Sequence, residues 1–136
     1  MRPFLFLIAF TAAAWATDRP DLNGTWQLSS TGEGKLKFET LLIQQNEDGV
    51  KITESGKEKP VDFSCAVDGH ECKLDDGAIS FWYNGSALVM MESHHNRDIV
   101  TKTRLVPAGD GKTLSLEITR VLPAGRNATY TFKKQP

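Results

Sequence analysis

The chain has 136 residues, of which 40% are hydrophobic and 24% charged, and its formal net charge at pH 7 is −1. This nearly neutral balance, with no basic cluster, argues against nucleic acid or an anionic membrane surface as a partner. The length suits one domain whose core buries roughly two-thirds of the surface of the unfolded chain.

The first 16 residues have the three parts of a secretion leader. Arg2 supplies the positive charge, residues 4–10 are apolar, and Ala14-Trp15-Ala16 is a small-x-small cleavage site. The apolar run is about half of the ~20 residues that a membrane span needs, and no cysteine follows the cleavage site to carry a lipid. We predict a signal peptide over residues 1–16 and a secreted or periplasmic domain over residues 17–136, without a membrane anchor.

Beyond the leader, the chain reads as short strands separated by turns. Apolar and polar side chains alternate, as at Leu114, Leu116 and Ile118, and Asn84-Gly85 is the strongest hairpin signal. No stretch has helical periodicity. We predict an all-β fold with about ten strands, a single antiparallel up-and-down meander that closes into a barrel of about 8–10 strands, because closure removes exposed edges.

The only cysteines are Cys65 and Cys72. Export to an oxidising compartment makes a disulfide between them the expected state. Asp68-Gly69 lies midway and favours a two-residue hairpin turn, which sets the two cysteines directly opposite each other. We therefore predict a β-hairpin over this stretch, closed by a structural disulfide.

Strand parity places a mixed set of side chains on the predicted inner face. The apolar ones are bulky, so a barrel of about eight strands has room for one small ligand at most. A lining that mixes apolar and polar groups is typical of ligand pockets. The polar residues with inward parity are Gln45, Glu54, Thr101 and Thr103.

The sequence contains no pattern of a catalytic site, such as Gly-x-Ser-x-Gly, His-Glu-x-x-His or a phosphate loop. His94 and His95 are adjacent, so on a strand they point to opposite faces and do not readily bind one metal ion. We expect no enzyme, no metal site and no cofactor. Three asparagines match the glycosylation acceptor pattern, although turn and strand-entry positions also explain them: Asn23, Asn84 and Asn127.

Three motifs spread over the chain carry a resemblance to a known family. They are Gly24-Thr25-Trp26, Trp82-Tyr83-Asn84-Gly85 and Asp110-Gly111-Lys112-Thr113-Leu114. With them the chain resembles the bacterial secreted lipocalin-like proteins, which belong to the calycin-type barrels. The resemblance implies a lipocalin-like β-barrel in which the indole of Trp26 plugs one end and Gly24 lets the chain bend into the first strand.

The resemblance also suggests a role for Arg120, because in lipocalins a late arginine packs across the first-strand tryptophan and closes the barrel. Two other roles stay open for Arg120: it could bind the acid group of a ligand, or it could lie at an exposed strand end. Fatty-acid-binding proteins hold the lipid carboxylate with Arg-x-Tyr on the last strand. The matching stretch here, Tyr130-Thr131-Phe132, has no arginine.

We therefore predict a non-enzymatic barrel that binds a small hydrophobic or amphipathic ligand in its mouth. The expected ligand contacts are Trp82, Tyr83, Met90 and Tyr130. The alternative is a module that acts through its surface, such as an inhibitor of a secreted protease. It would use a protein partner bound to the Trp82–Gly85 hairpin, whose outer face is also apolar.

Overall fold

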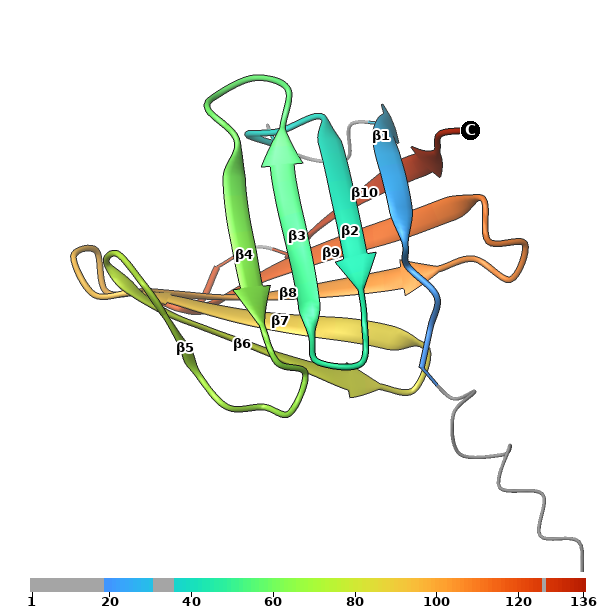
Figure 1. The fold of residues 1–136 in the computed structure, drawn as a ribbon. Helices are drawn as coiled ribbons and strands as arrows, with labels where there is room; N and C mark the ends of the chain where they lie inside the picture. The colour runs from blue at the N-terminus through green and yellow to red at the C-terminus, as the bar shows by residue number, and fades with distance from the viewer. Residues whose placement is uncertain (1–18, 31–35, 126) are drawn as a thin grey trace, which may run out of the picture.

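The computed structural model describes residues 19–30, 36–125 and 127–136, and the regular structure in that part of the chain is all β-strand (Figure 1). None of it forms a helix of the length and hydropathy needed to cross a membrane. The strands are β1 (Gly24–Ser30), β2 (Thr40–Gln45), β3 (Val50–Ser55), β4 (Val61–Cys65), β5 (Cys72–Leu74), β6 (Gly77–Asn84), β7 (Ala87–His94), β8 (Ile99–Pro107), β9 (Thr113–Leu122) and β10 (Asn127–Lys134).

These ten strands form one antiparallel sheet in the order β4-β3-β2-β1-β10-β9-β8-β7-β6-β5. Apart from β4 and β5, strands that are neighbours in the sequence pair with each other, and the pairing of β1 with β10 joins the first strand to the last. In Figure 1, β2–β4 stand upright in front of β6–β9, which run crosswise behind them. The predicted all-β up-and-down barrel is confirmed. It is nearly closed, because the two edge strands β4 and β5 share no ladder.

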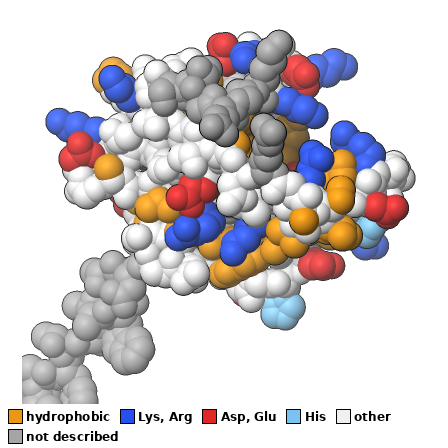
Figure 2. Space-filling view, turned by 180° about the vertical axis from the view of Figure 1, so that it is seen from behind, with side chains coloured by type: hydrophobic (Ala, Val, Ile, Leu, Met, Phe, Trp, Pro, Cys, Tyr) orange, Lys and Arg blue, Asp and Glu red, His pale blue; other side chains and the backbone are white. Residues whose placement is uncertain are grey.

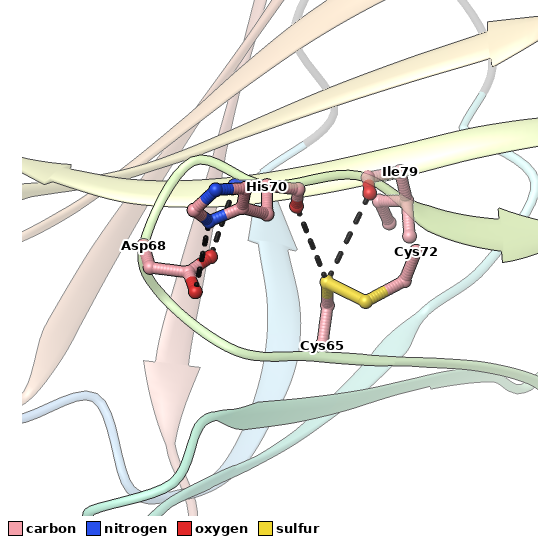
Figure 3. The surroundings of a disulfide bond; sticks show 5 residues. All are labelled: Cys65, Asp68, His70, Cys72 and Ile79. Atoms are coloured by element: carbon pink, nitrogen blue, oxygen red, sulfur yellow. Dashed lines mark hydrogen bonds and ion pairs between the residues drawn. A yellow bond between two sulfur atoms is a disulfide. The ribbon is translucent and has the colours of Figure 1, made fainter.

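A disulfide bridges these two edges. The predicted bond between Cys65 and Cys72 is present, with 5.9 Å between the two Cα atoms (Figure 3). The predicted hairpin around it is wrong, because no ladder joins β4 to β5: β4 pairs only with β3, and β5 pairs only with β6. The connecting loop instead packs on β6, where the Gly69 N–H donates to the Phe81 carbonyl at 3.0 Å. The disulfide thus supplies a covalent link at the seam where the sheet lacks hydrogen bonds.

The inner face of the barrel holds one hydrophobic cluster. Ile43 pairs with Ile52, and both are buried, as is Val50 on the same face, in agreement with the predicted parity. Phe81 and Phe132 reach the cluster from β6 and β10 and are fully buried. Each such side chain stabilises the fold by about 1.5–3 kcal/mol relative to an exposed one.

One end of the barrel is closed by the indole of Trp26, as the resemblance implies. The ring is fully buried, and its Nε1 donates a hydrogen bond of 2.9 Å to the carbonyl of Leu22, which is also fully buried. Gly24 has a φ of +136°, a backbone conformation that side chains rarely adopt, so only glycine readily makes this bend. The N-terminal segment therefore folds over the tryptophan as a plug.

Gln45, at the end of β2, fixes this plug. Its Oε1 accepts a hydrogen bond of 2.6 Å from the Leu22 N–H, and its Nε2 donates to the Pro20 carbonyl at 3.0 Å. The same Nε2 lies 2.9 Å from the Tyr83 hydroxyl. A single carboxamide thus ties the N-terminal segment to both β2 and β6, and its polar atoms are satisfied within the closed end.

The expectation that Arg120 covers Trp26 is wrong. The cation over the indole is Lys134 on β10, whose Nζ lies 5.7 Å from the ring centroid, within range of a cation–π interaction. Lys134 pairs with Trp26, and its N–H bonds to the carbonyl of Lys112 at the start of β9. Arg120 lies near the other end of β9, eight residues after Lys112 and thus roughly 26 Å farther along at ~3.3 Å per residue.

Candidate functional site

The end of the barrel away from Trp26 opens into a cavity of about 530 Å³. The apolar side chains that line it include Leu116, Ile118 and Tyr130 from β9 and β10, and Phe38 from the β1–β2 connection. Figure 2 looks into a hollow that has hydrophobic side chains at its floor and Lys or Arg side chains at its edge. The cavity therefore combines an apolar interior with a polar mouth.

A row of polar side chains crosses the mouth on three adjacent strands. Glu92 on β7 pairs with Thr101 on β8, and Thr101 pairs with Arg120 on β9. All three line the cavity. In the ten-strand order, β3 lies across the barrel from β8, so Glu54 on β3 faces this row from the opposite wall. The four side chains form a polar belt above the apolar floor.

The carboxyl group of Glu54 is shielded from water. Its pKa is raised from 4.5 to about 8, mainly by burial and also by the negative charge of Glu92, while Lys37 opposes both effects. At neutral pH the folded protein therefore holds Glu54 mainly in its neutral form, which can donate a hydrogen bond as well as accept one. Glu54 has the inward position that strand parity predicted.

His94 sits between two carboxylates at the rim of the cavity. Its Nδ1 lies 3.0 Å from Asp76 Oδ1, and its Nε2 lies 3.1 Å from Glu92 Oε2. Burial alone would lower the pKa of the imidazole, but the two carboxylate hydrogen bonds outweigh burial, so the pKa of His94 lies above its ordinary value. The same hydrogen bond lowers the pKa of Asp76. The two carboxylates favour the imidazolium form of His94, in which both ring nitrogens donate hydrogen bonds.

The predicted ligand contacts separate into different places. Tyr130 lines the cavity, but Tyr83 belongs to the closed end through its hydroxyl contact with Gln45. Met90 is buried in the core cluster and does not reach the cavity. Trp82 pairs with Val89 on the face of β6–β7 opposite the core. Only Tyr130 of the four therefore lies where a ligand in this cavity would touch it.

The sequence pattern contained signals for two cavity residues that we did not predict as site residues. Strand parity continued from Met90 leads inward to Glu92 and then His94, but the polar run from His94 onward resembles a solvated turn. The structure extends β7 to His94 and begins the turn after it. Alternation alone would have placed both side chains inside the barrel.

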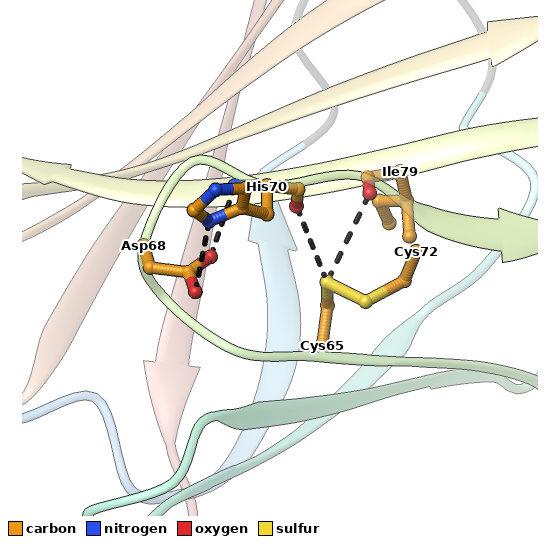
Figure 4. A network of polar contacts seen from close by, with 5 residues as sticks. All are labelled: Cys65, Asp68, His70, Cys72 and Ile79. Carbon is orange, nitrogen blue, oxygen red and sulfur yellow. Dashed lines mark hydrogen bonds and ion pairs between the residues drawn. A yellow bond between two sulfur atoms is a disulfide. The ribbon is translucent and has the colours of Figure 1, made fainter.

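Other candidate polar groups lie away from the cavity. The loop at the disulfide carries an exposed polar contact, in which the Asp68 carboxylate accepts from the backbone N–H of His70 and lies 3.1 Å from Nδ1 of the same histidine (Figure 4). Within the described residues, no group of three or more His, Cys, Asp or Glu side chains is placed to hold a metal ion. Of the asparagines in acceptor patterns, Asn23 uses its Oδ1 to accept from the Gln45 N–H, and Asn84 and Asn127 are exposed.

No family model and no curated protein matches this sequence. Solved structures do match over most of their length. Fatty-acid-binding protein 1 of Echinococcus granulosus is 14% identical with a TM-score of 0.67, over 85% of this chain and 98% of that one. Human cRBP IV is 18% identical with a TM-score of 0.64, over 85% and 98%. A secretory abundant heat soluble protein of Ramazzottius varieornatus is 13% identical with a TM-score of 0.68, over 85% and 96%.

These identities are low, so the likeness concerns the fold. It extends over nearly the whole of each neighbour, and the neighbours are small barrels of the same kind. Together with the ten-strand up-and-down sheet and the buried tryptophan on the first strand, it shows that this protein has the fold of a calycin-type β-barrel.

Proposed function

We propose that this protein is a secreted, non-enzymatic barrel that binds a small apolar or amphipathic ligand in its open cavity. The cavity is the observation that carries the proposal. Its volume of about 530 Å³ falls within the ~300–1,000 Å³ range of small-molecule sites. Its lining mixes apolar side chains with charged and polar groups in about equal number, and a mixed lining of this kind is compatible with an amphipathic ligand.

The fold neighbours and the covalent chemistry support this proposal. The Echinococcus granulosus neighbour is a fatty-acid-binding protein, and its barrel matches this one over 98% of its length. Secretion is supported by the leader pattern of residues 1–16, by the disulfide and by the secretory neighbour from Ramazzottius varieornatus. A ligand would enter through the mouth and leave the closed end undisturbed.

Binding in the cavity can be tested with Nile red, a neutral apolar dye. Ala128 on β10 lines the cavity, and its neighbour Thr129 is exposed on the outer side of the strand. We expect Ala128→Phe, which fills the mouth, to weaken dye binding at least tenfold, and Thr129→Phe to leave it within about twofold. Both variants place the same added ring on the same strand, so a general effect on stability is matched.

Two results would contradict the proposal. If Ala128→Phe and Thr129→Phe bind the dye as well as the wild-type protein does, the dye sits elsewhere and the cavity is not the binding site. If the wild-type protein binds no dye, and native mass spectrometry before and after organic extraction shows no bound small molecule, the barrel does not act as a carrier.

A further inference from the structure

Arg120 lines the mouth of the cavity without a carboxylate partner. Among the described residues, the ion pairs involve Asp68, Asp76, Glu92 and Glu117, and none of them includes Arg120. The nearest carboxylate in its own polar row, that of Glu92, is engaged by His94. The guanidinium is therefore free to bind an anion that enters the mouth.

The β9–β10 turn is shaped to hold this arginine. The Gly125 N–H donates to the Arg120 carbonyl at 3.2 Å, which folds the turn back over the strand. A side chain at position 125 would bring its Cβ to 3.1 Å from Arg120 Cβ and 3.3 Å from Cδ. Glycine at this position therefore leaves space for the aliphatic stem of Arg120 to lie against the turn.

The charges around the belt favour an anion over a cation. Lys37 and Arg97 also line the mouth, and neither forms an ion pair within the described ranges. Glu92 and Asp76 share the imidazolium of His94, and burial keeps Glu54 mainly protonated at neutral pH. The free mouth therefore has excess positive charge over an apolar floor.

We propose that Arg120 binds the acid group of an anionic amphiphile at the mouth of the barrel, with the apolar tail pointing inward toward Leu116 and Tyr130. A guanidinium offers a carboxylate two parallel hydrogen bonds, which gives both affinity and orientation. The inference rests on the proposed function, since it needs a ligand in the cavity. It adds the class of ligand, the residue that selects it and the direction in which it enters.

Glu54 gives this subsite a pH dependence. It faces the polar row of Glu92 and Arg120, and the other charged groups around it are His94, Lys37 and Arg97. When Glu54 ionises as the pH rises through about 8, its negative charge repels a bound acid group. Affinity for an acid should therefore fall between pH 7 and pH 9, whereas affinity for an uncharged amphiphile should not.

The test compares dodecanoate with dodecanol, which have the same tail, by displacement of Nile red at pH 7. We expect Arg120→Gln to weaken dodecanoate at least tenfold and dodecanol less than threefold. The matched control is Arg104→Gln, which removes an arginine that pairs with Glu117 at 2.9 Å away from the cavity. It should leave both amphiphiles within about twofold of the wild-type values.

Orientation and pH provide independent readouts. With dodecanoate labelled with ¹³C at either end, a soluble paramagnetic chelate should broaden the carboxyl signal more than the methyl signal. Glu54→Gln should reduce the fall in dodecanoate affinity between pH 7 and pH 9, and the part that remains reflects the deprotonation of His94.

The possible failures are distinct. If dodecanol binds and dodecanoate does not, or if Arg120→Gln and Arg104→Gln affect dodecanoate equally, the acid subsite is wrong and the ligand-binding barrel stands. Stronger broadening of the methyl signal would overturn the inward direction of the tail. If neither amphiphile displaces the dye and the dye itself does not bind, the proposed function fails together with the subsite.

Discussion

The two ends of this barrel differ in whether their polar and charged groups have partners within the protein. At the closed end, Trp26 and Leu22 are fully buried, and the polar atoms of Gln45 are paired with backbone groups and with Tyr83. At the mouth, Glu54 is kept mainly neutral by burial, and Arg120 forms no ion pair among the described residues. The first arrangement is complete without a ligand, and the second gains interactions when an anion arrives.

The difference shows where stability and function are separated in the chain. Groups that satisfy one another stabilise a fold, whereas buried or unpaired charges cost free energy and are retained where they serve binding. Substitutions at the closed end should therefore change the free energy of unfolding, and substitutions at the mouth should change its pH dependence and the affinity for ligands.

The largest effect should come from Trp26→Ala. Removing the fully buried indole leaves a cavity at the plug and breaks its hydrogen bond to the Leu22 carbonyl, so we expect a loss of ~3–5 kcal/mol in the free energy of unfolding. Urea unfolding followed by circular dichroism measures this loss. The control is Trp82→Ala on the outer face, where a partly exposed ring should cost about 1–2 kcal/mol. Equal losses in the two variants would contradict the conclusion that the closed end contributes more to stability than the outer face does.

A smaller effect should follow from opening the seam between β4 and β5. The double variant Cys65→Ala with Cys72→Ala should lose about 2–3 kcal/mol, because the bridge closes a short loop between two edges that share no ladder. Reduced wild-type protein should unfold at the same urea concentration as the double variant. Alkylation of the native, unreduced protein should add no mass, and modification of both thiols would show that the bridge does not form in solution.

The smallest effect should be the pH dependence that Glu54 imposes on the mouth. The unfolded chain releases this proton near pH 4.5 and the folded protein near pH 8, so folding takes up a proton between these values and stability falls as the pH rises. We expect the wild-type protein to lose on the order of 2 kcal/mol more than Glu54→Gln between pH 5.5 and pH 7. His94 and Asp76 titrate in both proteins, so their contributions cancel in the comparison. Parallel pH profiles would mean that Glu54 is solvated.

Local sequence signals were sufficient for the strands and for the burial of Trp26, but not for the cation that covers its ring, which is Lys134. Alternation placed Ile43, Val50 and Ile52 on the inner face, and the Gly-x-Trp motif marked Trp26 as the plug. The disulfide followed from the two cysteines and the predicted leader, whereas the pairing around it did not. Asp68-Gly69 favours a hairpin locally, but the loop that contains it packs on β6 through the hydrogen bond from the Gly69 N–H to the Phe81 carbonyl, a tertiary contact that no local pattern records.

The position of a side chain along the barrel axis could not be predicted from the sequence. Parity correctly placed Arg120 toward the cavity side of β9, yet whether it lies beside Trp26 or at the mouth depends on the register of β10 between β1 and β9. That register is set by turn geometry and by packing across the barrel, which no local pattern records. The same limit explains why Tyr83 and Tyr130, both inward, lie at different ends.

The plug also fixes where both described chain ends leave the barrel. The Gln135 N–H donates to the Thr25 carbonyl at 2.8 Å, and the Leu22 carbonyl accepts from the indole of Trp26. Both described ends of the chain therefore emerge beside the closed end. The protein can therefore be immobilised through a tether at Pro136 with its mouth facing free solution. Surface-based binding measurements with long-chain amphiphiles would then sample the cavity without obstruction by the support.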